Sequence, residues 1–244
     1  MKSHLFRFAL CLLLWPGGAA IAATDGQCRT VRFSDMGAPD LVIKTAAVAV
    51  VLEALGYRPQ TQPFSQAETF AALANGEIDV FLGADRRKMN RRMAGLQDRG
   101  AADELGVNQR VKSQELGPQK RGPPAAVAAI PATGGTEAGG AGEASGTDRN
   151  LNAGDQEAKG IETLARTGFA QTCPNVGKFI RNLTFPPQMT VFIARRMATE
   201  YEELFDAAVA WFDVNRDLLD IWLAGVKTTT DGDAVAAVLK EFGF

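Results

Sequence analysis

The chain has 244 residues, a formal net charge of -2 and a sequence pI of about 5.6. This balance gives no electrostatic reason to expect nucleic acid or an anionic membrane as a partner. The single histidine is His4, which lies in a predicted export signal, so no histidine base can serve a Ser or Cys nucleophile in the mature chain. No Cys/His spacing indicates zinc, and no glycine-rich loop indicates a phosphate site. We therefore expect no catalytic residue, no metal and no cofactor.

Residues 1–22 have the three parts of a secretory signal peptide. Lys2 and Arg7 give a positive start, residues 8–15 form a short apolar run, and residues 20–22 (AIA) supply small side chains at a cleavage site. The apolar run is too short to span a bilayer as a permanent helix. We therefore expect these residues to be removed and the mature protein to be periplasmic.

Cysteine usage fits that compartment. Cys11 lies in the predicted signal, which leaves Cys28 and Cys173 in the mature chain. An even pair in an oxidising compartment favours a disulfide, and the alternative is two unpaired buried thiols.

The first patterned block, residues 23–83, alternates strands with helices and is predicted to be part of a first α/β lobe. Its helix over residues 66–74 begins at a capping box, Ser65-Gln66-Ala67-Glu68. Such alternation indicates a parallel sheet with helices on both faces. Ligands of such sheets usually lie beyond the carboxyl ends of the strands, here after Ser34 and Leu82. The expected elements are a strand at 30–34, a helix at 40–55, a strand at 57–64, a helix at 66–74 and a strand at 78–82.

The next segment, residues 84–159, has no Phe, Tyr, Trp or Cys and is rich in Gly, Ala, Arg, Glu and Pro. This composition offers too little apolar surface to offset the entropy of ordering, so we expect disorder. We then interpret the cluster of arginines and lysine at residues 86–92 as a solvent-exposed run of charges. Both a shifted reading frame and a natural flexible linker remain open as origins of this segment.

The second patterned block, residues 160–244, is predicted to be helical and to pack on the first lobe. Trp211, Phe212 and Trp222 follow a helical apolar stripe together with several leucines, which indicates core rather than an aromatic cage. Asp213 and Asp217 are predicted to lie on the exposed face of the same helical segment. The expected helices cover residues 161–170, 176–183, 200–212 with a continuation past Asn215 to 224, and 234–242 with Asp233 as N-cap.

Four segments resemble the periplasmic substrate-binding proteins of choline and glycine betaine ABC transporters. They cover roughly 140 residues in the order found in that family. The resemblance implies a lobe of the type II periplasmic binding protein fold, with the second lobe incomplete or disordered. The segments are CRTVRFSDMGAPD with the apolar helix and LEALGY that follow it, NGEIDVFLG, CPNVGKFIRNLTF and WFDVNRDLLDIWLAGV.

The same resemblance marks candidate ligand-binding positions. A trimethylammonium group has no N–H to donate, so the family holds it against aromatic faces. Where the family places tryptophans after the first and third strands, this chain has Ala38 and Ala84. Asp40 matches a family position that contacts the polar end of the ligand, although an Asp after Pro39 and before a helix is also a good N-cap. Gly37 belongs to the same loop, where it shapes the turn.

The resemblance therefore implies a substrate-binding component of an ABC transporter, working with a membrane permease. Its expected ligand is choline or glycine betaine, bound weakly because both tryptophans are missing. An exported remnant that binds no ligand is the first alternative, and a small periplasmic enzyme is the second.

Overall fold

The computed structural model describes residues 28–110 and 160–244, and its centre is a five-stranded sheet with strand order β2-β1-β3-β5-β4. Every strand in these two ranges belongs to that sheet, so a second sheet is not present in this part of the chain. The strands are β1 (Thr30–Asp35), β2 (Arg58–Pro63), β3 (Val80–Asp85), β4 (Ala102–Arg110) and β5 (Gly160–Arg166).

The sheet is mixed. Strand β1 is parallel to both β2 and β3, as the alternation of strands and helices predicted. Strand β5 is antiparallel to both β3 and β4 and closes the other half of the sheet. The α/β class is thus confirmed, with a parallel half built by the first patterned block and an antiparallel half that joins the two blocks.

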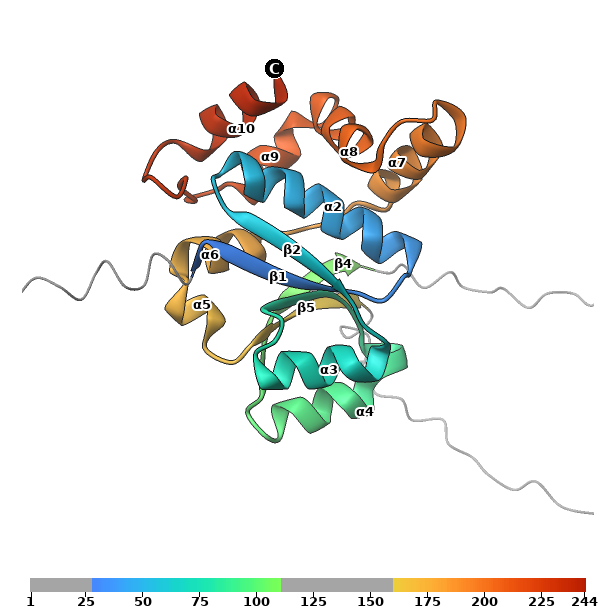
Figure 1. The fold of residues 1–244 in the computed structure, drawn as a ribbon, viewed down its shortest axis with the longest axis vertical. Helices are drawn as coiled ribbons and strands as arrows, with labels where there is room; N and C mark the ends of the chain where they lie inside the picture. The colour runs from blue at the N-terminus through green and yellow to red at the C-terminus, as the bar shows by residue number, and fades with distance from the viewer. Residues whose placement is uncertain (1–27, 111–159) are drawn as a thin grey trace, which may run out of the picture.

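Helices cover both faces of the sheet (Figure 1). The long helix α2 lies on one face and packs against α7, α8 and α10, while α3 and α4 lie together on the opposite face. None of the helices in the described ranges is long and apolar enough to cross a membrane. The helices are α2 (Pro39–Ala54), α3 (Gln66–Asn75), α4 (Arg86–Gln97), α5 (Phe169–Thr172), α6 (Pro174–Asn182), α7 (Pro187–Thr199), α8 (Leu204–Asp213), α9 (Arg216–Trp222) and α10 (Ala234–Phe242).

Local signals place several helix ends where the sequence predicts them. The capping box at Ser65 is confirmed, with the Ser65 hydroxyl accepting from the Glu68 N–H and the Glu68 carboxylate accepting from the Ser65 N–H. Asp233 caps α10 by accepting from the Ala236 N–H. Gly56 follows α2 at φ +90°, and a Cβ there would lie 2.3 Å from the Thr229 hydroxyl oxygen, so both conformation and space require glycine.

The predicted disorder of residues 84–159 is wrong for residues 84–110. Helix α4 buries Met89, Met93 and Leu96, which recur at helical spacing. Strand β4 pairs with β5 along its length. The prediction relied on missing aromatic residues, whereas methionine, leucine and sheet pairing supply the order. The rest of that segment, residues 111–159, lies outside the described residues, as does the predicted signal peptide.

Two helix predictions in the second block are also wrong. Residues 160–166 form strand β5 rather than a helix, because partners on both sides satisfy its backbone groups and bury Leu164 and Ala165. The helix expected over residues 200–212 begins only at Leu204, and α7 precedes it. Helix α7 starts at consecutive prolines, a normal first turn that the periodicity had not revealed.

The predicted disulfide is confirmed. Cys28 and Cys173 are bonded, with their Cα atoms 5.5 Å apart and a sequence separation of 145. The bond fastens the start of β1 to the α5–α6 junction. The two patterned blocks therefore share one core, in which Phe33 and Phe81 of the sheet are buried together with Phe212 and Trp222 of the C-terminal helices.

Candidate functional site

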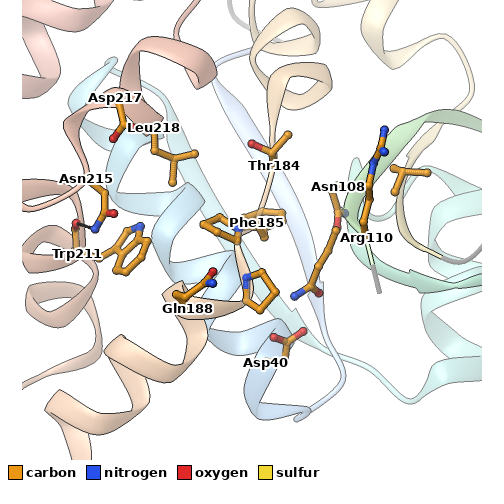
Figure 2. Close-up of a pocket in the computed structure, with 14 residues that line it drawn as sticks. Asp40, Asn108, Arg110, Thr184, Phe185, Gln188, Trp211, Asn215, Asp217 and Leu218 are labelled. Carbon is orange, nitrogen blue, oxygen red and sulfur yellow. Dashed lines mark hydrogen bonds between the residues drawn. The ribbon is translucent and has the colours of Figure 1, made fainter. Parts of the chain in front are cut away.

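A groove of about 1180 Å³ runs between the end of β4 and helices α8 and α9, with the N-terminus of α2 at its base (Figure 2). It exceeds the roughly 300–1,000 Å³ of an ordinary small-molecule pocket. Aromatic, carboxylate, amide and guanidinium side chains all reach it. The lining residues are Asp40, Val107, Asn108, Gln109, Arg110, Thr184, Phe185, Pro186, Pro187, Gln188, Trp211, Asn215, Asp217 and Leu218.

The segment that carries Phe185 is fixed from two sides. The Phe185 N–H donates to the Asn108 carbonyl at 2.7 Å, which ties it to β4. The Trp222 indole N–H donates to the Thr184 carbonyl at 3.1 Å, which ties it to α9. The rings of Phe185 and Trp222 also meet edge to face, with centroids 5.5 Å apart. Phe185 is therefore a rigid apolar wall in the middle of the groove, as Figure 2 shows.

Trp211 forms a second aromatic wall from α8. It is only 6% exposed, and its ring packs edge to face on Phe192 at 5.3 Å, so the predicted core role holds. The prediction missed that the same ring also lines the groove. Trp222 lies entirely in the core and Tyr201 is 89% exposed, so neither of them lines the groove.

Two buried polar atoms of the groove residues have no hydrogen-bond partner within the described ranges. One is the Trp211 indole N–H, a donor, and the other is the Asn108 side-chain oxygen, an acceptor. The Asn108 amide nitrogen, by contrast, donates to the Leu82 carbonyl and the Thr163 hydroxyl. Buried polar groups are seldom left unpaired in folded proteins. An unpaired donor and an unpaired acceptor at one groove are suited to a ligand or to water.

Asp40 contributes a carboxylate to the base of the groove. The N-cap of α2 is Ala38, and no side chain caps this helix end, so the N-cap role expected of Asp40 is wrong. Asp40 lies in the first helical turn, where the helix dipole favours a negative charge. One of its oxygens accepts from the Thr190 hydroxyl at 2.8 Å, and the other lies 2.5 Å from the Lys44 ammonium.

Lys44 is a buried cation beside the groove. Its side chain is 1% exposed, and its ammonium donates to the Gln109 side-chain oxygen at 2.5 Å and lies 5.6 Å from the Phe185 ring centroid. Burial lowers the pKa of Lys44, while the hydrogen bond and charge of Asp40 and the charge of Asp85 act in the opposite direction. Sequence reasoning treated this lysine as one position of an apolar helix. A lysine within the otherwise apolar run of residues 41–52 was the available signal.

The structure separates the predicted ligand-binding positions. Asp40 lines the groove, but Gly37, Ala38 and Ala84 do not. Gly37 is exposed at φ +70° and its N–H donates to the Asp35 carboxylate, which fits the expected turn role. Ala38 is exposed beside Pro39, two residues before Asp40.

Ala84 differs from the expectation that it lies in a loop. It is 0% exposed within β3 and is paired with Glu162 of β5. The expected loop after Leu82 does not form, because residues 84 and 85 find strand partners in the second block. In addition, Asp85 caps α4 by accepting from the Arg87 N–H at 3.1 Å.

The basic cluster at the start of α4 is partly an ion-pair network rather than a wholly solvated run. Arg86 binds Glu162 of β5 and Glu104 of β4, and Arg87 binds Asp85. The other end of the cluster, Arg91 and Arg92, is exposed as expected. In the two described ranges, no group of three or more His, Cys, Asp or Glu side chains is placed to hold a metal ion.

Sequence comparison finds a family to which the first block is similar. Residues 29–112 match the family described as the substrate binding domain of ABC-type glycine betaine transport systems. The match continues beyond Gly83, where the resembling segment NGEIDVFLG ends, and so includes α4 and β4. An uncharacterized protein, ORF1, of Chromohalobacter salexigens is 40% identical over 63 residues. The aligned region is 26% of this chain and 41% of that relative's length.

Solved structures share the fold. An ABC-transporter choline-binding protein in complex with choline matches with a TM-score of 0.66 and 22% identity, over 89% of this chain and 99% of that chain. Lactococcal OpuAC complexed with glycine betaine matches with a TM-score of 0.54 and 11% identity, over 80% of this chain and 99% of that chain. The chain is thus similar at residues 29–112 to the substrate binding domain of ABC-type glycine betaine transport systems, and it shares the fold of choline- and glycine betaine-binding proteins.

Proposed function

We propose that this chain is the substrate-binding component of an ABC transporter for choline- or glycine betaine-type quaternary ammonium compounds, with low ligand affinity. It acts after export to the periplasm, delivers ligand to a membrane permease and has no enzymatic activity. The observation that carries the proposal is the groove itself, in which two aromatic walls and the Asp40 carboxylate meet. The family match and the fold of the choline-binding protein support the choice of ligand class.

The groove offers complementary chemistry to both ends of such a ligand. The faces of Trp211 and Phe185 attract a quaternary ammonium group by cation–π interaction, which is worth about 0.5–1 kcal/mol at exposed sites and about 2 kcal/mol when desolvated. Asp40 and Asp217 supply negative charge near that group. The unpaired indole N–H of Trp211 can donate to a ligand hydroxyl or carboxylate.

Two features favour weak binding. The groove is wide compared with a small ammonium ligand, so much of the ligand stays hydrated and each cation–π contact falls toward the lower value. Ala38 also stands where the resemblance implies a tryptophan, whereas Ala84 is buried in β3 and does not line the groove. If a typical receptor binds at micromolar strength, about -8 kcal/mol, then losing one wall at about 2 kcal/mol and weakening the two remaining walls to about 0.5 kcal/mol each predicts millimolar affinity or weaker.

Calorimetric titration of the purified mature protein tests the proposal. The ligands are choline, glycine betaine and, as a neutral isostere of choline, 3,3-dimethylbutan-1-ol. We expect choline and glycine betaine to bind with a Kd of about 1 mM or weaker, and more tightly than the neutral isostere. Micromolar binding would refute the low affinity, and equal binding of choline and its isostere would refute cation recognition. Absence of all binding would leave an exported remnant without a ligand.

A further inference from the structure

The ammonium group of Lys44 contacts the Asp40 carboxylate and the Phe185 ring, the two groups that the ammonium group of a ligand would use. We propose that Lys44 is an internal competitor of cationic ligands, held on the Asp40 carboxylate and the Phe185 ring and displaced when a quaternary ammonium compound binds. The inference rests on the proposed function, because it concerns the same groove. It adds a residue of this chain that sets the groove's affinity for cations.

Geometry places the Lys44 ammonium in the position of a bound cation. It lies 2.5 Å from an Asp40 carboxylate oxygen and 5.6 Å from the Phe185 centroid. The second distance is within the roughly 6 Å range of a cation–π interaction. Asp40 and Phe185 both line the groove, whereas Lys44 is 1% exposed and is not one of the lining residues. A carboxylate and an aromatic face are the two elements by which proteins recognise ammonium compounds.

Occupation from within lowers the affinity for a ligand from outside. A ligand cation that approaches Asp40 meets a like charge that is already paired, so it must either displace Lys44 or bind beside it. The observed affinity is then the intrinsic affinity reduced by the fraction of molecules in which the site is free. A neutral ligand of the same shape forms no ion pair with the carboxylate, so this mechanism does not make its affinity depend on Lys44.

Lys44 also connects α2 to β4 through the Gln109 side chain. If this structural role were its only one, removing the charge would change the stability of the protein and would affect charged and neutral ligands alike. Competition for Asp40 instead predicts a change that depends on ligand charge. The experiment must therefore compare the two ligand types in one variant.

The main variant is Lys44→Met, which keeps most of the side-chain volume and removes the charge. Choline and 3,3-dimethylbutan-1-ol are titrated into the wild type and the variant by calorimetry, with tetramethylammonium as a cation that lacks a polar end. Lys227→Met, at an exposed lysine outside the groove, is the matched control. Asp40→Asn/Lys44→Met tests whether the effect depends on the carboxylate. Lys44→Gln, which keeps a hydrogen-bond donor, serves if the Met variant does not fold.

We expect Lys44→Met to strengthen choline and tetramethylammonium binding by about tenfold or more and to leave the neutral isostere within about twofold. Lys227→Met should bind choline as the wild type does, and the double variant should lose the gain.

Choline binding that is equal in wild type and Lys44→Met overturns the inference but leaves the proposed function intact. A gain shared by the neutral isostere overturns it as well. Binding by Lys44→Met alone supports the inference and rejects the wild type as a receptor. Absence of binding by both overturns both proposals.

Discussion

The Asp79 carboxylate accepts a hydrogen bond from the Arg166 Nε at 2.7 Å, across 87 positions of the sequence. Asp79 is 2% exposed and precedes β3, while Arg166 ends β5. The same carboxylate accepts from the Arg32 guanidinium at 2.8 and 2.9 Å and from the Arg32 backbone N–H at 2.9 Å. One buried acid thus joins β1, β3 and β5, and so joins the two patterned blocks of the chain.

Replacement of that acid should destabilise the fold. Asp79→Asn keeps the shape but leaves two arginines without their counter-charge, and breaking a buried pair costs about 3–5 kcal/mol. Both arginine side chains are partly exposed, so we expect about 3 kcal/mol, the lower end of that range. Urea denaturation measures the difference. Asp213→Asn, at an exposed pair with Arg216, is the matched control and should cost no more than about 0.5 kcal/mol.

Acid stability should depend on the same group. Burial raises the pKa of Asp79, but hydrogen bonds from Arg32 and Arg166 outweigh that effect and lower the pKa below its ordinary value. Because the folded-state pKa is depressed, the stabilisation is complete above the unfolded-state value of about 3.9 and is lost as pH falls through the folded-state value. The free energy of unfolding of Asp79→Asn should therefore fall less steeply below about pH 5 than that of wild type. Parallel curves for the two proteins would contradict this assignment.

The Cys28–Cys173 bond should stabilise the protein. It closes a loop of 145 positions, for which the chain-entropy model gives about 5 kcal/mol, and measured values are typically about 2–4 kcal/mol. Cys28→Ser/Cys173→Ser should lower the free energy of unfolding by such an amount in urea denaturation. Dithiothreitol should produce a similar loss in the wild type and none in the variant. Two alkylatable thiols in natively folded wild-type protein would contradict the bond.

The parallel half of the sheet was predictable because its signals are local. The capping box at Ser65, Gly56 after α2 and the alternation of short apolar strands each act over a few residues. The disulfide was predictable for a different reason. The mature chain was expected to be periplasmic and to keep two cysteines, which can form one pair. The C-terminal helix was predictable because Asp233 and the apolar spacing after it agree.

The antiparallel half and the groove were not predictable, because both depend on contacts between distant segments. Strand β5 is a strand only because β3 and β4 lie on either side of it. The position of Asp40 at the start of the expected helix suggested a cap. Its partner Thr190 becomes apparent only when α7 packs beside α2, whereas Lys44 lies one turn later in the same helix. Trp211 had a core pattern and is buried, yet one side of it lines the groove. Helical spacing alone cannot distinguish these two roles.

The sequence resemblance implies tryptophans at the positions of Ala38 and Ala84, and we expect a tryptophan substitution to affect stability differently at these two positions. Ala84 is 0% exposed in the sheet, so Ala84→Trp overfills the core and should cost at least about 3 kcal/mol of stability. Ala38 is exposed at the N-cap of α2, so Ala38→Trp should change stability by no more than about 0.5 kcal/mol. Thermal and urea unfolding of the two variants measure this contrast. Equal stabilities would mean that Ala84 is not enclosed.

Ligand binding should also respond to Ala38→Trp. An indole placed two residues before Asp40 adds an aromatic face near the groove, where the ligand remains partly hydrated. We therefore expect a gain of about 0.5–1 kcal/mol in choline affinity, measured by calorimetry, rather than the 2 kcal/mol of an enclosed cage wall. Gln171→Trp, exposed on α5 and outside the groove, controls for unspecific indole contacts. No gain with Ala38→Trp, or an equal gain with Gln171→Trp, would place the ammonium group away from the α2 end of the groove.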